Sequence, residues 1–304
     1  MKVGAPNGGG RSVSIRKRVL LYGAALLLLF WFLGPILWLV SASFQLDNEL
    51  FSVPPHWIPH NPTLDNYTFL ITREPPPVYQ GAEMGRRASG EALSAIPALK
   101  NSLVVAGSVM VLNLALSALA AYPFSRLRFA GKDFILGFIV TSRLIPAIAV
   151  AIPFFAIVQR LGLLDTKLAL ILVYLAFTLP FTIWFLIKYF DFVPPEIEEA
   201  ALVDGCNRLQ ALLRIVLPLS LPGLAATGAF AFMLAYSEFL FAVLLTRTMA
   251  SKTVPVVLSA AAINFDVSYA LASTAVVIAI LPPIVLALLF RNYVLRGLST
   301  AFGQ

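Results

Sequence analysis

The sequence predicts an all-α integral membrane protein that crosses the bilayer six times. The chain has 304 residues, of which 59% are hydrophobic and 12% are charged, and its mean hydropathy is +0.86. A soluble domain has about 45–50% apolar and about 25% charged residues. The net charge of +7 comes without a basic stripe interleaved with exposed aromatic residues, so it indicates membrane topology and no nucleic-acid binding.

Six apolar runs have the length of about 20 residues that a helix needs to cross a bilayer. They are Val19–Phe44, Leu99–Phe124, Phe134–Val158, Leu168–Phe190, Leu219–Leu245 and Tyr269–Phe290. The first run follows basic residues, as in a signal peptide, but it is too long for one and lacks an A-x-A-like cleavage site. Prolines inside several runs predict kinked spans around a pathway, since neighbouring helices can satisfy the freed carbonyls.

The distribution of Lys and Arg orients these spans. More basic residues flank the spans on the side of the N-terminus than on the opposite side, which predicts that both ends lie in the cytoplasm of a bacterial cell with the spans in its inner membrane. We therefore expect a cytoplasmic tail at 1–18, a membrane domain at 19–290 and a cytoplasmic tail at 291–304. Within the membrane domain, the loop 45–98 lies outside and the connection 191–218 lies inside.

The cytoplasmic connection has the end signals of a helical hairpin. Pro194 and Pro195 suit the first turn of a helix, where a missing N–H costs no internal bond. Gly205 suits the left-handed residue that ends this helix, because glycine adopts that conformation without strain. Asn207 and Gln210 have the spacing of a capping box at the start of a second helix.

Each predicted helix of the hairpin carries an apolar face. Ile197, Ala200 and Ala201 form a narrow face of mostly small side chains. A second stripe follows from Leu209, Leu212, Leu213 and Val216. The hairpin could pack on the membrane surface or bind another protein. The alanines favour binding, because small side chains let a partner approach the backbone closely.

This hairpin resembles the signature of ABC importer permeases. Glu199-Ala200-Ala201, three residues, Gly205, nine residues and then Ile215–Pro218 match that signature, and Asp204 before the glycine is typical of sugar importers. The resemblance to MalG-type carbohydrate permeases extends to further motifs, among them Asn66-Tyr67, Asn101-Ser102, Ala120–Phe129, Leu161–Thr166 and Ser237–Ala242. It implies an ATPase-coupling set of Glu198, Glu199, Ala200, Ala201, Leu202, Asp204, Gly205, Ile215, Leu217 and Pro218.

The resemblance also implies a fold, a mode of action and partners. The fold is that of a type I ABC importer permease, with six spans and a cytoplasmic coupling hairpin. Such a chain is not an enzyme and holds no cofactor, because ATP and Mg bind to separate ATPase subunits. Consistent with this, Gly131-Lys132 lacks the preceding glycine and the hydroxyl residue of a phosphate-binding loop. The expected partners are a MalF-type second permease, an ATPase dimer, an extracytoplasmic sugar-binding protein, the sugar and membrane lipid.

Three departures from the family pattern concern the outside, the pathway and the C-terminus. The stretch 72–96 is an insertion in an outer loop that is usually shorter. Tyr236-Ser237-Glu238-Phe239 replaces the more usual Trp-Asn-Glu-Phe. Residues 297–304 lack the Gly-Leu-Thr-Ala-Gly tail that reaches the ATPase in some relatives.

Arg143 and Glu238 are charged residues inside predicted spans, where an unpaired charge costs at least about 2.5–3.5 kcal/mol. We favour a structural ion pair between them over a polar gate or sugar contact. Asn113, Tyr236 and Ser237 are further candidates for a sugar path, because a hydroxyl-rich ligand needs fixed donors, acceptors and an apolar platform. Each is expected to serve mainly as a helix–helix contact.

The remaining chemistry-bearing residues are few. Cys206, as the one cysteine, excludes an internal disulfide and a cysteine-based metal cluster. His56 and His60 lie among prolines that disfavour a helix, and no acidic residue completes a zinc motif in the sequence, so they are predicted to be ordinary loop histidines.

Two other functions remain open at this point. An ion-gradient-driven carrier or channel should show several carboxylates inside the membrane and paired broken helices, for which Glu238 alone is weak support. A membrane-embedded enzyme should show a catalytic cluster, and the spans contain no histidine.

Overall fold

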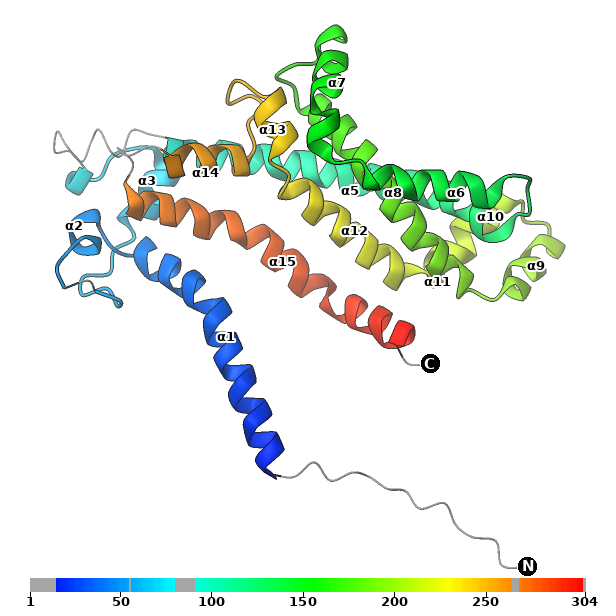
Figure 1. Cartoon of the computed structure of the whole chain (residues 1–304), viewed down its shortest axis with the longest axis horizontal. Helices are drawn as coiled ribbons and strands as arrows, with labels where there is room; N and C mark the ends of the chain where they lie inside the picture. Colours follow the sequence, from blue (N-terminus) through cyan, green and yellow to red (C-terminus); the bar gives the residue numbers. More distant parts are fainter. Residues whose placement is uncertain (1–14, 55, 80–90, 264–267, 303–304) are drawn as a thin grey trace, which may run out of the picture.

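The computed structural model describes residues 15–54, 56–79, 91–263 and 268–302, and every regular element in these ranges is a helix (Figure 1). Four helices are long and apolar enough to cross a membrane, and the number is six if each of two bent pairs counts as one span. The predicted fold class is therefore confirmed, and at least one of the proline-containing runs is bent as predicted.

Four of the predicted spans are single helices. They are α1 (Ile15–Ser43), α5 (Ala95–Arg126), α8 (Lys167–Asp191) and α15 (Tyr269–Phe302). The helix α15 continues without a break through the expected boundary at 290. Uninterrupted apolar sequence is sufficient to specify these helices, because a helix satisfies its own backbone hydrogen bonds in lipid.

The third predicted span is bent. It consists of α6 (Lys132–Thr141), the 3₁₀ turn η3 (Ser142–Leu144) and α7 (Ala147–Arg160), and its two halves make an angle of 97°. Pro146 directly precedes α7. Proline supplies no N–H and disfavours helical backbone in the residue before it, so a break in the helix is favoured at this position.

The expectation of one continuous fifth span is wrong. The helix α12 (Leu221–Tyr236) ends where the Ser-Glu-Phe segment begins, and the short α13 (Leu240–Leu245) follows. Another apolar helix, α14 (Val254–Ile263), follows α13 and precedes α15, and no predicted span covers it. Its ten residues are too few to cross a bilayer.

The segment 45–98, which is the predicted outer loop, contains short helices held by buried polar groups. They are α2 (Asp47–Leu50), α3 (Asp65–Thr72), η1 (Pro77–Tyr79) and η2 (Glu91–Ser94), and residues 80–90 of the predicted insertion lie outside the described ranges. Asn66 is fully buried and donates from Nδ2 to the carbonyl oxygens of Ser43 (2.9 Å) and Gln45 (2.7 Å). Asp47 accepts the N–H of Ala270 at 2.9 Å and so ties α2 to the start of α15.

The helices α5 and α8 form the centre of the bundle. Two clusters of buried apolar side chains lie along them, and α12 packs against both helices (Figure 1). In contrast, α1 contacts the bundle at the C-terminal end of the helix, near Ser43. The rest of α1 diverges from the bundle, so that Phe30 and Trp31 are about three-quarters exposed. An apolar helix with this exposure is covered by lipid or by another protein.

Candidate functional site

The predicted hairpin is present between α8 and α12. It consists of α9 (Pro195–Val203), α10 (Arg208–Ala211), the π-helical segment η4 (Leu212–Val216) and α11 (Leu217–Leu219). Pro195 occupies the first helical turn, and Gly205 has a φ of +93°, as the left-handed turn requires. These two predictions are confirmed.

The second arm of the hairpin is less regular than expected. Its capping box is confirmed: the Gln210 N–H donates to Asn207 Oδ1 and the Asn207 N–H donates to Gln210 Oε1, both at 2.9 Å. After one turn, however, the helix widens into η4, and the arm meets α12 at 83°. The predicted stripe is only half buried: Leu212 and Val216 are buried, whereas Leu209 and Leu213 are exposed.

Glu198 attaches the first arm to the end of α5. Its side chain is buried, with only 2% of the residue exposed. It accepts hydrogen bonds from the Tyr122 hydroxyl and from Arg126 Nε, the latter at 2.7 Å. Arg208, at the start of α10, places Nη1 3.9 Å from the same carboxylate. A buried carboxylate is stable only when its charge is paired and its oxygens accept hydrogen bonds, and both conditions are met here.

The Arg126 guanidinium extends this attachment to the end of α8. It donates from Nη2 to the carbonyl oxygen of Val193 at 2.8 Å and from Nη1 to Ser125 Oγ at 3.2 Å. Ser125 in turn donates to Asp191 Oδ1 at 2.6 Å. We call Tyr122, Arg126 and Glu198 the hairpin anchor. Through it, the last turn of α5, the end of α8 and the helix α9 are held as one unit.

The predicted coupling residues divide between the inside and the surface of the hairpin. Glu199, Ala200, Asp204, Gly205 and Pro218 are exposed, Leu202, Ile215 and Leu217 are half-buried, and Glu198 and Ala201 are buried. Glu198 therefore positions the hairpin and cannot itself contact a partner while the anchor is intact.

The exposed face of α9 differs from the predicted one. Ala201 turns inward, and Val203, which we did not single out, is 88% exposed. Ile197, Ala200 and Val203 form the outward row, which we call the docking face. Their regular spacing of three residues could have revealed this row, because residues three apart lie on one side of a helix.

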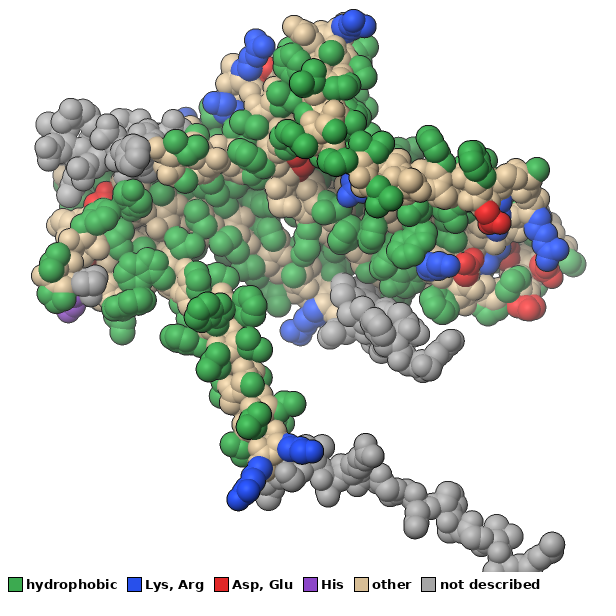
Figure 2. All heavy atoms as spheres, in the orientation of Figure 1, with side chains coloured by type: hydrophobic (Ala, Val, Ile, Leu, Met, Phe, Trp, Pro, Cys, Tyr) green, Lys and Arg blue, Asp and Glu red, His purple; other side chains and the backbone are tan. Residues whose placement is uncertain are grey.

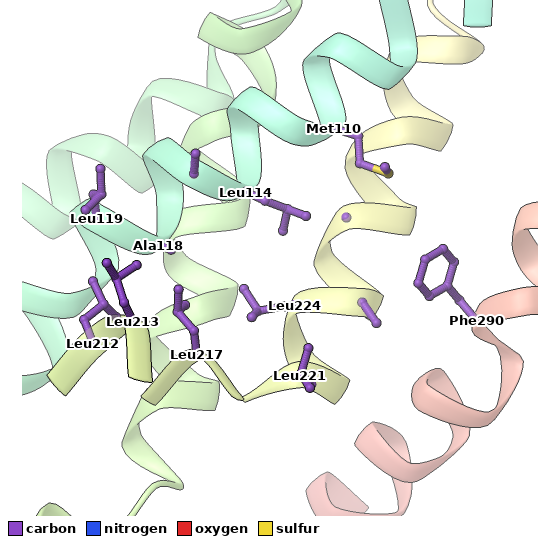
Figure 3. Close-up of a pocket in the computed structure, with 13 residues that line it drawn as sticks. Met110, Leu114, Ala118, Leu119, Leu212, Leu213, Leu217, Leu221, Leu224 and Phe290 are labelled. Carbon is purple, nitrogen blue, oxygen red and sulfur yellow. The ribbon is translucent and has the colours of Figure 1, made fainter. Parts of the chain in front are cut away.

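Behind the hairpin lies a groove lined by leucines (Figure 3). Its volume is about 530 Å³, and α5, the second arm, α12 and α15 all contribute to it. We call it the leucine groove, and its lining residues include Leu114, Leu119, Leu213, Leu217 and Leu224. The groove suits an apolar helix or an acyl chain and not a sugar, which needs fixed polar partners.

Acidic and basic side chains lie together around the hairpin. Figure 2 shows acidic and basic side chains gathered over α9 and α10 at one end of the bundle, while hydrophobic side chains cover most of the face between the two ends. The hairpin is thus a polar, rigidly attached element at the end of an apolar bundle.

Comparisons with known proteins agree with this geometry. Residues 113–300 match the family described as "Binding-protein-dependent transport system inner membrane component". The chain belongs to this family. It is 32% identical to the trehalose/maltose transport system permease protein MalG of Thermococcus litoralis, over 94% of this chain and 96% of that protein. It is 33% identical to the sulfoquinovosyl glycerol transport system permease protein SmoH of Agrobacterium fabrum, over 91% of this chain and 90% of that protein.

A solved structure has the same fold. It is a bacterial ABC transporter involved in the import of the acidic polysaccharide alginate, and the match has a TM-score of 0.75 at 22% identity. The match covers 92% of this chain and 98% of the alginate transporter chain. The protein is therefore a multi-pass, non-enzymatic inner-membrane component of a transport system that depends on a binding protein, with the fold of an ABC importer permease.

In this permease, the predicted ion pair between Arg143 and Glu238 is absent. Arg143 lies in η3 at the bend of the third span, and it forms no ion pair with any residue of the described ranges. Glu238 instead caps α13, accepting the N–H groups of Phe241 (3.0 Å) and Ala242 (3.2 Å). A carboxylate is favourable there because the first N–H groups of a helix have no partner within the helix. The structural ion-pair interpretation is wrong.

Arg143 and Glu238 nevertheless line the same small cavity. Its volume is about 150 Å³, and Tyr174, Thr178 and Phe241 contribute to its wall. The cavity lies at the two broken spans, between η3 and the end of α12. The polar-gate interpretation of the two charges therefore remains a prediction.

The other three pathway candidates contact helices of the same permease. Asn113 donates to Thr178 Oγ1 at 2.6 Å, between α5 and α8. The Tyr236 hydroxyl donates to the carbonyl oxygen of Ala279 at 2.8 Å, between α12 and α15. Ser237, directly after α12, donates to the carbonyl oxygen of Met233 in that helix. Their expected role as helix contacts is confirmed for Asn113 and Tyr236.

Asp165 forms a clamp that sequence reasoning missed, and we call it the outer clamp because it lies on the predicted outer side. It follows α7 with a φ of +59° and accepts the N–H groups of Arg247 (2.9 Å) and Thr248 (3.0 Å). The hydroxyls of Thr248 and Ser251 also donate to it. Burial disfavours its charged form, but these donors outweigh burial and hold the pKa of the carboxyl well below its usual value. The α7–α8 turn and the segment after α13 are thereby joined.

Both histidines have an acidic neighbour in the structure. Glu49, seven residues before His56, comes within reach of both rings. The sequence contains no acidic residue in the spacing of a zinc motif, and the fold brings this one to the histidines. The chain folds back between α2 and α3, and no sequence spacing indicated that contact.

Proposed function

We propose that the permease is the membrane subunit of an ATP-driven sugar importer and that its hairpin receives the movement of separate ATPase subunits. The observation that carries this proposal is the pairing of an exposed docking face with a buried anchor on the same nine-residue helix, α9. A helix of this length is not stable alone in water. It can transmit force only because the anchor fixes it to longer helices.

The anchor suggests the route of the movement. When ATP and Mg bind between the two ATPase subunits, those subunits approach each other and pull on Ala200, Val203 and the neighbouring Asp204. The pair of Glu198 and Arg126 passes this displacement to α5, and Ser125 passes it to Asp191 at the end of α8. The helices α5 and α8 then tilt together, which opens the cavity alternately to each side of the membrane.

A second permease of the MalF type completes the pathway in this proposal. The exposed apolar side chains of α1 and the leucine groove offer surfaces on which such a partner can pack. In this arrangement the extracytoplasmic binding protein docks on the side of α2, α3 and α14. Both ends of the chain lie in the cytoplasm with the hairpin.

Sugar is the proposed substrate class because the similar permeases are named for sugar transport. Their printed names include trehalose/maltose, sulfoquinovosyl glycerol and, for a relative in Mycobacterium tuberculosis, trehalose. The cavity at Arg143 and Glu238, at about 150 Å³, is smaller than the range of about 300–1,000 Å³ that is usual for ligand pockets. We therefore place the main sugar contacts between the two permeases, with Arg143 and Glu238 as polar gate residues.

The proposal is tested by co-purification of the ATPase with tagged permease variants. Gly205→Asp should abolish co-purification, because an aspartate strains the left-handed turn and adds charge at the contact. Val203→Asp should also reduce it, without strain, because it places a charge on the docking face. Val53→Asp is the matched control, since Val53 is 94% exposed on the outer loop.

All three variants should insert into the membrane as the unchanged chain does. Normal ATPase association of both hairpin variants would contradict the proposal. Uptake of a labelled sugar in reconstituted vesicles, driven by a proton or sodium gradient without any ATPase, would support the carrier alternative instead.

A further inference from the structure

Glu49, His56 and His60 converge on the outer side of the permease. Each residue offers one ligand atom, and the three atoms lie within 4.8 Å of one another. Glu49 Oε1 is 3.8 Å from His60 Nδ1, and the two imidazole ring centres are 4.0 Å apart. The chain has only two histidines, and the fold brings both to one carboxylate.

Contacts within the outer loop hold this cluster together. Glu49 Oε1 accepts the backbone N–H of His60 at 2.5 Å, which joins α2 to the end of the 56–60 segment. The Gln45 amide donates to the carbonyl oxygen of His56 at 3.3 Å, and the Ser52 hydroxyl lies 3.3 Å from His56 Nδ1. A hydrogen bond to one ring nitrogen orients an imidazole, which is the arrangement commonly found around metal-binding histidines.

The chemistry of these groups selects a particular kind of cation. Two imidazoles and one carboxylate match the three protein ligands of an open Zn²⁺ site, in which water occupies the fourth position. Tetrahedral Zn²⁺ with bonds of about 2.0–2.1 Å places its ligand atoms about 3.4 Å apart. The Glu49–His60 distance of 3.8 Å is already close to this value. The His60 side chain is 66% exposed, so its ring can rotate to close the remaining distance.

We propose that Glu49, His56 and His60 form a Zn²⁺-type metal site on the outer face of the permease. The site is independent of the hairpin and of the sugar pathway. Imidazole ligands favour Zn²⁺ and its neighbours in the first transition row over Mg²⁺ and Ca²⁺, which prefer oxygen ligands. A bound metal would join α2 to the segment that contains Trp57. Trp57 packs on Trp38 of α1 with ring centres 4.9 Å apart, so the metal would also steady the outer end of α1.

The test is a Zn²⁺ titration of the purified full chain in detergent, in competition with a chromophoric chelator. The chain must carry a tag without histidine, and Cys206→Ser removes the one thiol that could bind zinc elsewhere. We expect one Zn²⁺ per chain and no competition from Mg²⁺ or Ca²⁺. Binding should also raise the unfolding temperature, because it stabilises the folded state by mass action.

Ligand variants decide whether the three residues form the site. His56→Ala, His60→Ala and Glu49→Gln should each weaken Zn²⁺ binding by about a hundredfold or more, since removal of even an outer-shell partner typically costs 10–100-fold. Glu74→Gln is the matched control, because Glu74 is an exposed glutamate of the same outer loop. It should bind as the unsubstituted chain does.

Three outcomes would overturn the proposal. The first is Zn²⁺ affinity in the unsubstituted chain no higher than in the double variant His56→Ala/His60→Ala. The second is unchanged affinity in Glu49→Gln, which would exclude the carboxylate as a ligand. The third is a stoichiometry of one metal per two chains, which would indicate a contact between copies and not a site within one chain.

Discussion

Removal of the Glu198 carboxylate should release α9 from the bundle. In Glu198→Ala, the Arg126 guanidinium keeps its contacts with Val193 and Ser125 but loses the carboxylate that neutralises it. The side chains of Arg126 and Glu198 are only 8% and 3% exposed, so water cannot replace the lost partner without opening the hairpin.

The expected cost follows from this burial. Removing one member of a buried charge pair typically costs about 3–5 kcal/mol, because the other charge remains desolvated. Arg208 adds little, since its side chain is 55% exposed and its nitrogen lies 3.9 Å from the carboxylate. At about 1.36 kcal/mol for each factor of ten, a loss of about 3 kcal/mol raises the population of detached α9 about 150-fold.

Hydrogen–deuterium exchange with mass spectrometry can measure this change on peptides that cover 195–205. The helix α9 has nine residues, and a helix this short unfolds in water once it is detached. Its amides, such as the Asp204 N–H bonded to the Ala200 carbonyl oxygen, therefore report detachment. Glu198→Ala should lower their protection by about a hundredfold or more, while peptides from the middle of α8 stay unchanged.

Two comparisons make the result decisive. Glu196→Ala removes an exposed carboxylate from the same helical turn, and loss of its dipole interaction costs at most about 1 kcal/mol, or about fivefold in protection. Arg126→Met combined with Glu198→Leu leaves neither charge unpaired and should recover much of the protection. If Glu198→Ala exchanges no faster than Glu196→Ala, the anchor does not hold the hairpin and the proposed route of force is refuted.

Two further predictions concern the outer clamp and a close helix contact. Asp165→Asn should lower stability by about 1.5–3 kcal/mol, because an amide accepts the clamp's N–H and O–H donors less strongly than a carboxylate does. Since the pKa of Asp165 is lowered in the folded state, the clamp's contribution is present above the usual aspartate pKa of about 3.9 and is lost as the pH falls below it. The difference in unfolding temperature between the unsubstituted chain and Asp165→Asn should thus be constant from about pH 8 to about pH 5 and shrink below about pH 4; growth on acidification would contradict the clamp. Gly223→Ala places a Cβ 2.2 Å from the Tyr189 ring and should destabilise the permease by about 1–3 kcal/mol in thermal unfolding. Gly137→Ala, in a helix with open space around it, should be neutral or stabilising, and equal effects of the two substitutions would exclude the close approach as the cause.

Local sequence signals were sufficient for the regular parts of the molecule. The apolar runs located α1, α5, α8 and α15 because helix formation in a membrane depends on length and hydrophobicity along one stretch of chain. The turn at Gly205 and the capping box of Asn207 were predictable for a similar reason, since each motif closes hydrogen bonds within a few residues. The family followed from the same local motifs.

Breaks in the helices were harder to predict. Pro146 coincides with a 97° bend, whereas Pro180 lies inside the continuous helix α8. A proline weakens a helix at its position, but the surrounding helices decide whether the chain turns there. For the same reason, the end of α12 at Tyr236 and the capping of α13 by Glu238 could not be read from an apolar run that continues to Leu245.

The sequence by itself determined the class of protein, the positions of most spans and the presence of the helical hairpin, because these depend on composition and on contacts between near neighbours. Only the tertiary structure decided that Glu198 faces inward to Arg126 while Val203 faces outward, and that Asp165 and Glu49 reach partners far along the chain or across a folded loop. These pairings depend on how helices pack and where loops return. A charge at one position carries no information about the partner that folding will bring to it.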